Sequence, residues 1–531
     1  MDKTASEKLL EGSSAPKPSS PSKTKSQYLL IAFSMANLCL ITAWFASLFD
    51  NDFGYFNKIP VSWKVLGALF TNLAVLTFVF WCSGLFVRRM NNRFLSIAAH
   101  VAMLVIWVIP LDFYRSTMLQ MPDRSVLHGL KSPLGLGAML VGLMAVTLWH
   151  QRIARASAVA FLILSPLALF TVGKSLSVLI GWTHIAQASA DCHPLVPPSS
   201  STNVPRVVWI IFDEMDYRFA FANRPVELKM PELDRFRGES WSATQAYPPA
   251  GATIASIPSF LSGRTVRSAV PISERDLRLR LEPTGEVVAW SQLPSVFAAA
   301  RQEGANCGVV GWYHPYGRLF TDSLSWCEWA PIPKFEPARF ESFAGTIRQE
   351  LLAMVNPINQ RLLHIRNFKQ SQNAAVAMAT NRQCHLAFMH LPIPHKPGIV
   401  SRQGALTAFG IPPEHAYFGN LVLVDRTFGT IRQAMEKSGV WNDSWVLVTS
   451  DHWWRTGMGN PGPVDRRVPF LLKAPDDVSH QYSRPFNTVI AHDLTLAILR
   501  HQLKSGAQLG DWFDEHATAP PTSYKDDPEV E

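Results

Sequence analysis

The sequence has few charged residues. Asp, Glu, Lys and Arg make up 17% of its 531 residues, and hydrophobic residues make up 47%. A soluble globular protein carries about 25% charged residues, and the apolar excess is concentrated in the first third of this chain. The net charge of +8 does not indicate nucleic acid, because the basic residues are scattered and some cluster beside the apolar runs. We interpret the charge as membrane topology combined with an anionic substrate, and we expect no nucleic-acid partner.

Cysteine is also scarce, and the sequence has no internal repeat. None of the six cysteines is placed with the spacing of a zinc finger, which excludes a structural zinc site of that kind. Two of them lie in apolar runs. The other four fall where we expect the chain to face an oxidising space, so disulfide pairing is open there. These four are Cys192, Cys307, Cys327 and Cys384.

The first third of the chain contains long apolar runs with few charged residues. Five runs, each near the roughly 20 residues that a spanning helix needs, lie at about 28–49, 63–87, 94–113, 132–149 and 157–182. Residues 1–26 are rich in Ser, Pro and Lys, which predicts a disordered cytoplasmic tail. This tail does not begin a signal peptide, since the first apolar run is long enough to span a membrane. We expect a transmembrane domain of five helices over 27–182.

Lysine and arginine give the expected orientation. They are frequent in the tail, in the loop after the second apolar run (Arg88, Arg89 and Arg93) and in the loop after the fourth (Arg152 and Arg155). The positive-inside rule places these segments in the cytoplasm, although several other basic residues then fall outside. Five spans that start from a cytoplasmic tail leave the rest of the chain outside.

The sequence changes character after the last apolar run. Residues 183–204 are polar and rich in proline, which indicates a linker. From Val207 onward, apolar runs of strand length alternate with amphipathic helical segments. This alternation predicts a largely parallel sheet with helices on both faces. We expect this α/β domain over 205–515 and a flexible tail over 516–531.

Polar side chains lie at the ends of three predicted strands and beside one predicted helix. Buried parallel strands present such side chains at their carboxyl ends, where open α/β sheets place their sites. Thr253 follows a turn at Gly251 and begins a predicted helix, a place where an anion can bind. A lone threonine there would be only a helix N-cap. Oxygen and imidazole ligands that converge on a hydroxyl predict a metal-activated nucleophile. The strand-end residues are Asp213, Glu214, His390, His395, Asp451 and His452.

These motifs resemble those of the alkaline phosphatase and sulfatase superfamily. The likeness is greatest to its membrane-anchored transferase branch, which includes the lipid A phosphoethanolamine transferases and the lipoteichoic acid synthases. Thr253-x-x-Ser256-x-Pro258 is similar to the nucleophile segment of the phosphoethanolamine transferases, and Ser450-Asp451-His452 to the metal motif of the superfamily. The resemblance extends from about Val207 to Arg500 and implies an alkaline-phosphatase-like fold for the α/β domain.

The resemblance also implies roles for site residues. Asp213, Thr253, Asp451 and His452 would hold the first metal, with Thr253 as the nucleophile and Glu214 as the alternative to Asp213. Three oxygens and one nitrogen suit zinc, with manganese or magnesium as alternatives. In sulfatases the position of Thr253 is a Cys or Ser that becomes formylglycine. A threonine cannot be converted in this way, so we expect phosphoryl-type transfer in place of sulfate ester hydrolysis.

Further candidates would face the substrate or a second metal. His395 would contact a phosphate or a second metal. His390 would either orient the strand that leads to His395 or bind metal itself. His314 either contacts substrate or packs within its loop. The phosphoethanolamine transferases supply another histidine downstream of Ser-Asp-His, but none occurs from Trp453 to Lys473. We expect Arg455 to hold the phosphate there, leaving one tightly bound metal.

We therefore predict a membrane-anchored, metal-dependent transferase. It would move a phosphoethanolamine-like or phosphoglycerol-like headgroup from a membrane lipid to an envelope glycan or glycolipid through Thr253. The resemblance places it in a bacterial inner membrane, multi-pass, with the catalytic domain facing the periplasm or cell exterior. The alternatives are a sulfatase-like hydrolase of phosphodiesters or phosphonates and a non-catalytic relative that binds anionic glycans.

Overall fold

The computed structural model describes residues 25–48, 55–56, 63–90, 92–119, 132–181, 204–332, 342–455, 464–476 and 478–524. Most of the predicted tail over 1–26, nearly all of the predicted linker over 183–204 and the chain after Tyr524 lie outside the described residues. The chain forms two compact units. One comprises Met1–Ile41 with Phe70–Lys174, and the other comprises Thr42–Leu69 with Ser175–Glu531.

The N-terminal region is helical, as its apolar runs predict. Among its described residues, three stretches are long and apolar enough to span a membrane, namely Trp63–Val87, Phe94–Met118 and Leu148–Val178, and the pair α1–α2, bent by 64°, would make a fourth. The predicted span over 132–149 is not among them, because α7 continues across a kink at Trp149 and only Pro133–Gly142 forms a shorter apolar helix. The elements are α1 (Lys25–Cys39), α2 (Ile41–Leu48), α3 (Trp63–Met90), α4 (Arg93–Ile106), α5 (Val108–Phe113), η1 (Tyr114–Met118), α7 (Pro133–Ile163) and α8 (Ser165–Gly181).

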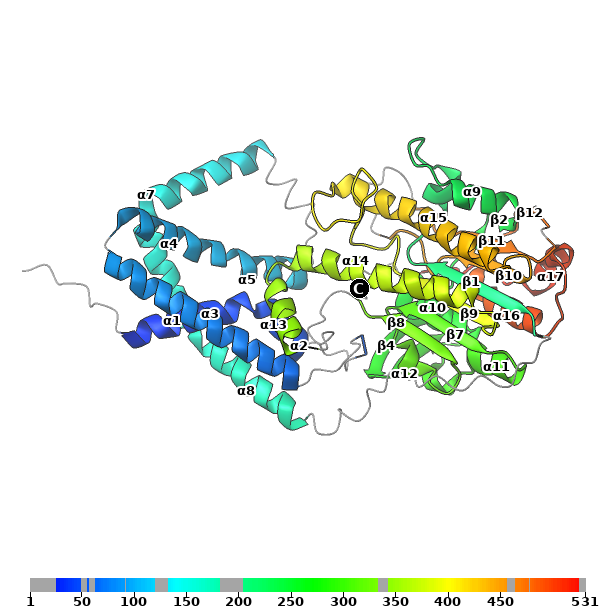
Figure 1. The fold of residues 1–531 in the computed structure, drawn as a ribbon, viewed down its shortest axis with the longest axis horizontal. Coiled ribbons are helices and arrows are strands. Elements are labelled where there is room, and N and C mark those ends of the chain that lie inside the picture. The colour runs from blue at the N-terminus through cyan, green and yellow to red at the C-terminus, as the bar shows by residue number, and fades with distance from the viewer. Residues whose placement is uncertain are drawn as a thin grey trace, which may run out of the picture. The chain divides into compact units, whose positions relative to one another are not determined.

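An eight-stranded sheet organises the second part of the chain, in the order β12-β2-β11-β10-β1-β9-β7-β8 (Figure 1). The central strand β1 pairs in parallel with both β9 and β10, and β7 pairs in parallel with β8 and β9. β11 is antiparallel to its neighbours β10 and β2. The strands are β1 (Arg206–Phe212), β2 (Trp241–Ala243), β7 (Cys307–Trp312), β8 (Trp326–Ala330), β9 (Leu386–Leu391), β10 (Ser444–Thr449), β11 (Phe470–Lys473) and β12 (His480–Tyr482). The predicted α/β domain with a mostly parallel sheet is confirmed.

Helices cover both faces of this sheet, which explains why its central strands are apolar throughout. Alternate residues of β1 enter two different cores: Trp209 packs with one, and Ile210 with the other. The first core contains residues of α10 (Thr253–Ser262), α11 (Val296–Gln302), α16 (Ala491–Leu499) and α17 (Leu509–His516). The second contains residues of α9 (Pro231–Gly238), α14 (Asn356–Thr380) and α15 (Pro413–Lys437). The long helices α14 and α15 run side by side (Figure 1).

Smaller elements surround the main sheet. β4 (Val266–Ser273), β5 (Asp276–Leu281) and β6 (Val287–Ala289) form an antiparallel sheet, and β3 (Ala246–Tyr247) pairs with β13 (Phe486–Asn487). Short helices are η3 (Arg218–Ala222), η4 (Trp290–Gln292), α12 (Tyr316–Leu319), α13 (Phe343–Leu352), η6 (Thr488–Ile490) and η7 (Gly506–Gln508). Part of the predicted flexible tail is described, and in it the ring of Tyr524 lies against Trp453, with centroids 4.8 Å apart.

Candidate metal and nucleophile site

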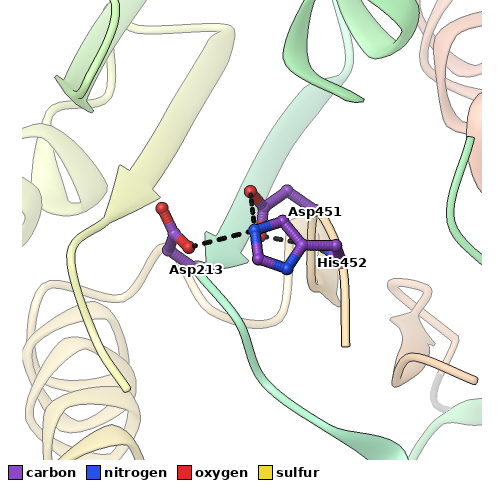
Figure 2. Close-up of side chains that lie close together, drawn as sticks. All are labelled: Asp213, Asp451 and His452. Atoms are coloured by element: carbon purple, nitrogen blue, oxygen red, sulfur yellow. Dashed lines mark hydrogen bonds and ion pairs between the residues drawn. The ribbon is translucent and has the colours of Figure 1, made fainter. Parts of the chain in front are cut away.

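Two neighbouring strands bring the acids together. β1 ends at Phe212 and is followed by Asp213, and β10 ends at Thr449 and is followed by Ser450, Asp451 and His452. The two strands are parallel, with Ile211 opposite Thr449, so their carboxyl ends meet at one edge of the sheet. Figure 2 shows the side chains of Asp213, Asp451 and His452 converging there. All three are fully buried.

Thr253 is the first residue of α10, and its hydroxyl points into this cluster. Thr253 Oγ1 lies 3.2 Å from His452 Nε2 and donates to Asp213 Oδ2 at 3.4 Å. The N-cap position belongs to Ala252, so the alternative of a capping threonine does not apply. The hydroxyl therefore lies at the positive end of the α10 helix dipole, between the carboxylate of Asp213 and the imidazole of His452. Thr253 as a whole is only 3% exposed.

His452 presents a lone pair to the cluster. Its Nδ1 lies 2.8 Å from the carbonyl oxygen of Trp453. A carbonyl only accepts hydrogen bonds, so Nδ1 carries the hydrogen of the neutral ring and Nε2 carries the lone pair. Nε2 lies 3.5 Å from Asp451 Oδ2 and 3.7 Å from Asp213 Oδ1. Three acceptor atoms thus face one another.

Among the described residues, no donor reaches two of these acceptors. Asp213 Oδ1 and Asp451 Oδ2 are buried without a hydrogen-bond partner, which costs about 1–3 kcal/mol for each. The other oxygen of Asp451 is held by the backbone N–H groups of Glu214 and His452, at 3.1 and 3.0 Å. The carboxylate is therefore oriented by its surroundings while its second oxygen points into the cluster.

The distances between the candidate ligand atoms suit a divalent cation. A tetrahedral zinc with bonds of about 2.0–2.2 Å keeps its ligand atoms about 3.3–3.6 Å apart. The distances from His452 Nε2 to the three oxygens are 3.2, 3.5 and 3.7 Å. One ligand atom from each of Asp213, Asp451 and His452 can be chosen so that all lie within 4.8 Å of one another. The residues present thus fit a metal with one nitrogen and three oxygen ligands.

The charges of the site also favour a cation. Burial raises the pKa of Asp213 well above its usual value, the charge of Asp451 raises it further, and Arg455 opposes both effects. Burial likewise raises the pKa of Asp451. Two buried carboxylates with raised pKa values resist ionising together. A bound cation would reverse this tendency, because it favours the charged form of both.

Trp312 holds Asp213 by a hydrogen bond, and His390 and Tyr316 lie beside it. Trp312, the last residue of β7, donates its indole N–H to Asp213 Oδ2 at 2.5 Å. His390 Nε2 lies 3.4 Å from the same oxygen, and the hydroxyl of Tyr316 lies 2.9 Å from His390 Nδ1. Sequence reasoning assigned no such role to Trp312 or Tyr316. Trp312 does end an apolar run of strand length, and such run ends lie at the edge of the sheet where Asp213 and Asp451 meet.

The remaining candidates lie around the cluster without joining it. The ring of His395 packs against Trp312, with centroids 5.2 Å apart, and its Nδ1 lies 2.7 Å from the carbonyl of Lys396. The charge of Arg455 lowers the pKa values of Asp213 and Asp451, so it lies within electrostatic reach of both. Glu214 has a positive φ of 68° and contributes its backbone N–H to Asp451.

Two histidines for which the sequence allows a loop or surface position are fully buried. His314 is fully buried, and its Nε2 lies 3.2 Å from the carbonyl oxygen of Thr253. His364 lies in a helical pattern that predicts a surface position, and that prediction is wrong: its side chain is 0% exposed. It sits on α14 with its ring 5.8 Å from that of Trp312. The helix packs this side against the sheet, which its sequence pattern alone did not reveal.

No family model and no curated protein sequence matches the chain. Solved structures do match in part. Ps i-CgsB in complex with k-i-k-neocarrahexaose is 16% identical, with a TM-score of 0.42 over 60% of this chain and 75% of that one. The phosphonate monoester hydrolase of Agrobacterium radiobacter is 13% identical, with a TM-score of 0.38 over 56% and 74%. A protein of the alkaline phosphatase superfamily from Vibrio parahaemolyticus is 14% identical, with a TM-score of 0.38 over 57% and 68%. Since these TM-scores are below 0.5, the functional argument rests on the site itself.

Proposed function

We propose that the α/β domain is a phosphotransferase whose nucleophile is the hydroxyl of Thr253. The observation that supports this most is the convergence of that hydroxyl with two orphaned carboxylate oxygens and an imidazole lone pair. With both carboxylates ionised, this set contains more acceptor atoms than the one hydroxyl can satisfy. It suits a divalent cation, for which zinc is the first choice and manganese or magnesium are alternatives.

Asp213, Asp451, His452 and Thr253 would hold the metal. When bound there, it would lower the pKa of the Thr253 hydroxyl and neutralise charge on the phosphate oxygens. Trp312 fixes the carboxylate of Asp213 through its other oxygen, and His390 Nε2 lies 3.4 Å from that oxygen. Arg455 and His395 would contact the phosphate, since a guanidinium can hold two of its oxygens.

The proposed reaction has two transfers. In the first, Thr253 Oγ1 forms a bond to phosphorus and releases its proton, and the bond to the lipid alcohol breaks as that alcohol takes up a proton. In the second, an acceptor hydroxyl attacks the phosphothreonine and Thr253 leaves as the hydroxyl. The donor would be a membrane lipid with a phosphoethanolamine-like or phosphoglycerol-like headgroup, and the acceptor an envelope glycan or glycolipid.

Purified protein in its native lipids tests this function. We expect the released diacylglycerol-type alcohol to rise with time and the headgroup to appear on an added envelope glycan, and neither to occur with Thr253→Ala. Headgroup released into water at the same rate without any glycan would instead assign a hydrolase of the same site. Metal binding with no turnover of any lipid or phosphodiester would support a non-catalytic glycan-binding protein.

We also propose that the domain faces away from the cytoplasm, in a bacterial inner membrane. The support is the Lys and Arg content of the tail and of two further segments, one ending at Arg93 at the start of α4 and one around Arg155, which lies within α7. A reporter active only outside the cytoplasm should be active when fused after Pro205 and silent when fused after Arg93. The reverse pattern would overturn the orientation.

A further inference from the structure

Two residues from the loop between α2 and α3 lie inside the α/β domain. Thr42–Leu69 belongs to the same compact unit as Ser175–Glu531. Tyr55 is 0% exposed and is part of the same core as Trp209 of β1. Its backbone carbonyl accepts a hydrogen bond from Arg318 Nη2 at 2.6 Å. The neighbouring ring of Phe56 meets that of Tyr313 edge to face at 5.1 Å.

Tyr55 reaches the nucleophile through one histidine. The hydroxyl of Tyr55 lies 2.8 Å from His314 Nδ1, and His314 Nε2 lies 3.2 Å from the carbonyl oxygen of Thr253. The carbonyl can only accept, so Nε2 of His314 carries the hydrogen. Nδ1 then carries the lone pair, and the Tyr55 hydroxyl must be the donor.

The chain of bonds runs in one direction through the fully buried, neutral ring of His314: the Tyr55 hydroxyl donates to Nδ1, and Nε2 donates to the carbonyl oxygen of Thr253. The hydroxyl of Tyr55 fixes the ring of His314, and the ring fixes the peptide that carries Thr253.

We propose that Tyr55 is a positioning residue for Thr253, so that the active-site domain is complete only with the loop between the first two apolar segments. The inference rests on the proposed function in taking Thr253 as the nucleophile. It makes the membrane region part of the catalytic machinery as well as an anchor, because removing it would leave Nδ1 of His314 buried without a donor.

The same contact constrains the membrane topology. Phe56 and β1 must lie on one side of the membrane, so the chain between them crosses an even number of times. Among the described residues after Phe56, three long apolar stretches would give an odd number. A further crossing is therefore required, and the ten-residue apolar helix Pro133–Gly142 is too short to make it alone. The five spans expected from the sequence meet this condition.

The matched variants Tyr55→Phe and Tyr482→Phe test the positioning role. Each removes one tyrosine hydroxyl, and that of Tyr482 donates to Asp514 at 2.9 Å, outside the metal and nucleophile cluster. We expect Tyr55→Phe to lower kcat about 10–100-fold, as loss of a group that orients a catalytic residue does, with KM little changed. Tyr482→Phe should keep the wild-type kcat. Tyr55→Phe combined with His314→Ala should be no slower than His314→Ala alone, because both act through one path. A wild-type kcat for Tyr55→Phe would overturn the proposal.

A photo-crosslink tests the docking of the loop without any assay of turnover. Phe56 is replaced by p-benzoylphenylalanine in the full-length protein in membranes, and the crosslinked peptides are identified by mass spectrometry after irradiation. We expect a crosslink to the peptide that contains Tyr313. Crosslinks confined to residues before 182 would overturn the proposal. If Thr253→Ala retained turnover, the proposed function would fail while this crosslink still formed, so the two failures can be distinguished.

Discussion

Replacing Asp213 by asparagine should make the metal-free protein more stable and the enzyme inactive. In the metal-free state, Asp213 Oδ1 and Asp451 Oδ2 are buried acceptors without donors. Asparagine has nearly the same shape. Its carbonyl oxygen can keep the hydrogen bond from Trp312, and its amide N–H can donate to Asp451 Oδ2 or His452 Nε2. The substitution also removes one of two buried like charges.

The magnitude follows from the number of groups satisfied. One buried acceptor that gains a donor is worth about 1–3 kcal/mol. The free energy of unfolding of the metal-free protein should rise by that amount. At about 2–4 °C per kcal/mol for a large domain, the Tm should rise by about 2–12 °C. Turnover should fall about 100- to 1000-fold or more, since the metal that would stabilise the developing charge loses a charged ligand.

Thermal unfolding with a chelator and with added zinc gives both values. The control is Asp234→Asn, which alters an exposed carboxylate paired with Arg224 and should change stability by less than about 0.5 kcal/mol. Zinc should stabilise the wild-type protein and Asp234→Asn, and should have no effect on Asp213→Asn. If metal-free Asp213→Asn were less stable than the wild type, Asp213 would be a structural acceptor for Trp312, and the reasoning for a cation site would be refuted.

Three further predictions concern the same cluster. Thr253→Ala should abolish turnover and cost about 1 kcal/mol of stability, the net value of one hydrogen bond. Thr253→Ser should keep part of the activity because the hydroxyl remains. Near-normal turnover in Thr253→Ala would move the nucleophile elsewhere. Because the pKa values of Asp213 and Asp451 are raised, the metal-free protein should lose stability as pH rises from 3.8 toward those raised values, whereas metal binding should release protons and weaken as pH falls; calorimetry in buffers of different ionisation enthalpy measures the protons, and zero release would contradict the pKa directions. Elemental analysis should find one tightly bound metal per chain, and Arg455→Ala should lower turnover without removing it; two metals with a fully active Arg455→Ala would show a second metal site.

The sequence predicted the frame of the site well because its signals are local. Each of β1, β9 and β10 is a short run of apolar residues, which a strand buried on both faces requires, and the acids follow at the ends of β1 and β10. Parallel pairing then brings Asp213 beside Asp451 without further information. The start of α10 at Thr253 was also readable, from the turn that precedes it.

Long-range packing could not be read in the same way. The bond from Trp312 to Asp213 joins residues 99 apart, and that from Tyr55 to His314 joins residues 259 apart. Nothing local to either residue marks its partner. The direction of β11 was equally hidden, since an apolar run has the same pattern whether its strand is parallel or antiparallel. Helix α7 also continues through Trp149, so it contains residues of two predicted spans, 132–149 and 157–182.

The central claim is that Thr253 carries the transferred phosphate. The most direct measurement is mass spectrometry of the protein after brief incubation with native lipids, followed by acid quenching and digestion. The account predicts a phospho-headgroup adduct on the peptide that contains Thr253, present in the wild type and absent after metal removal or in Thr253→Ala. Turnover of lipid with no adduct on that peptide, and with the same rate in Thr253→Ala, would contradict it.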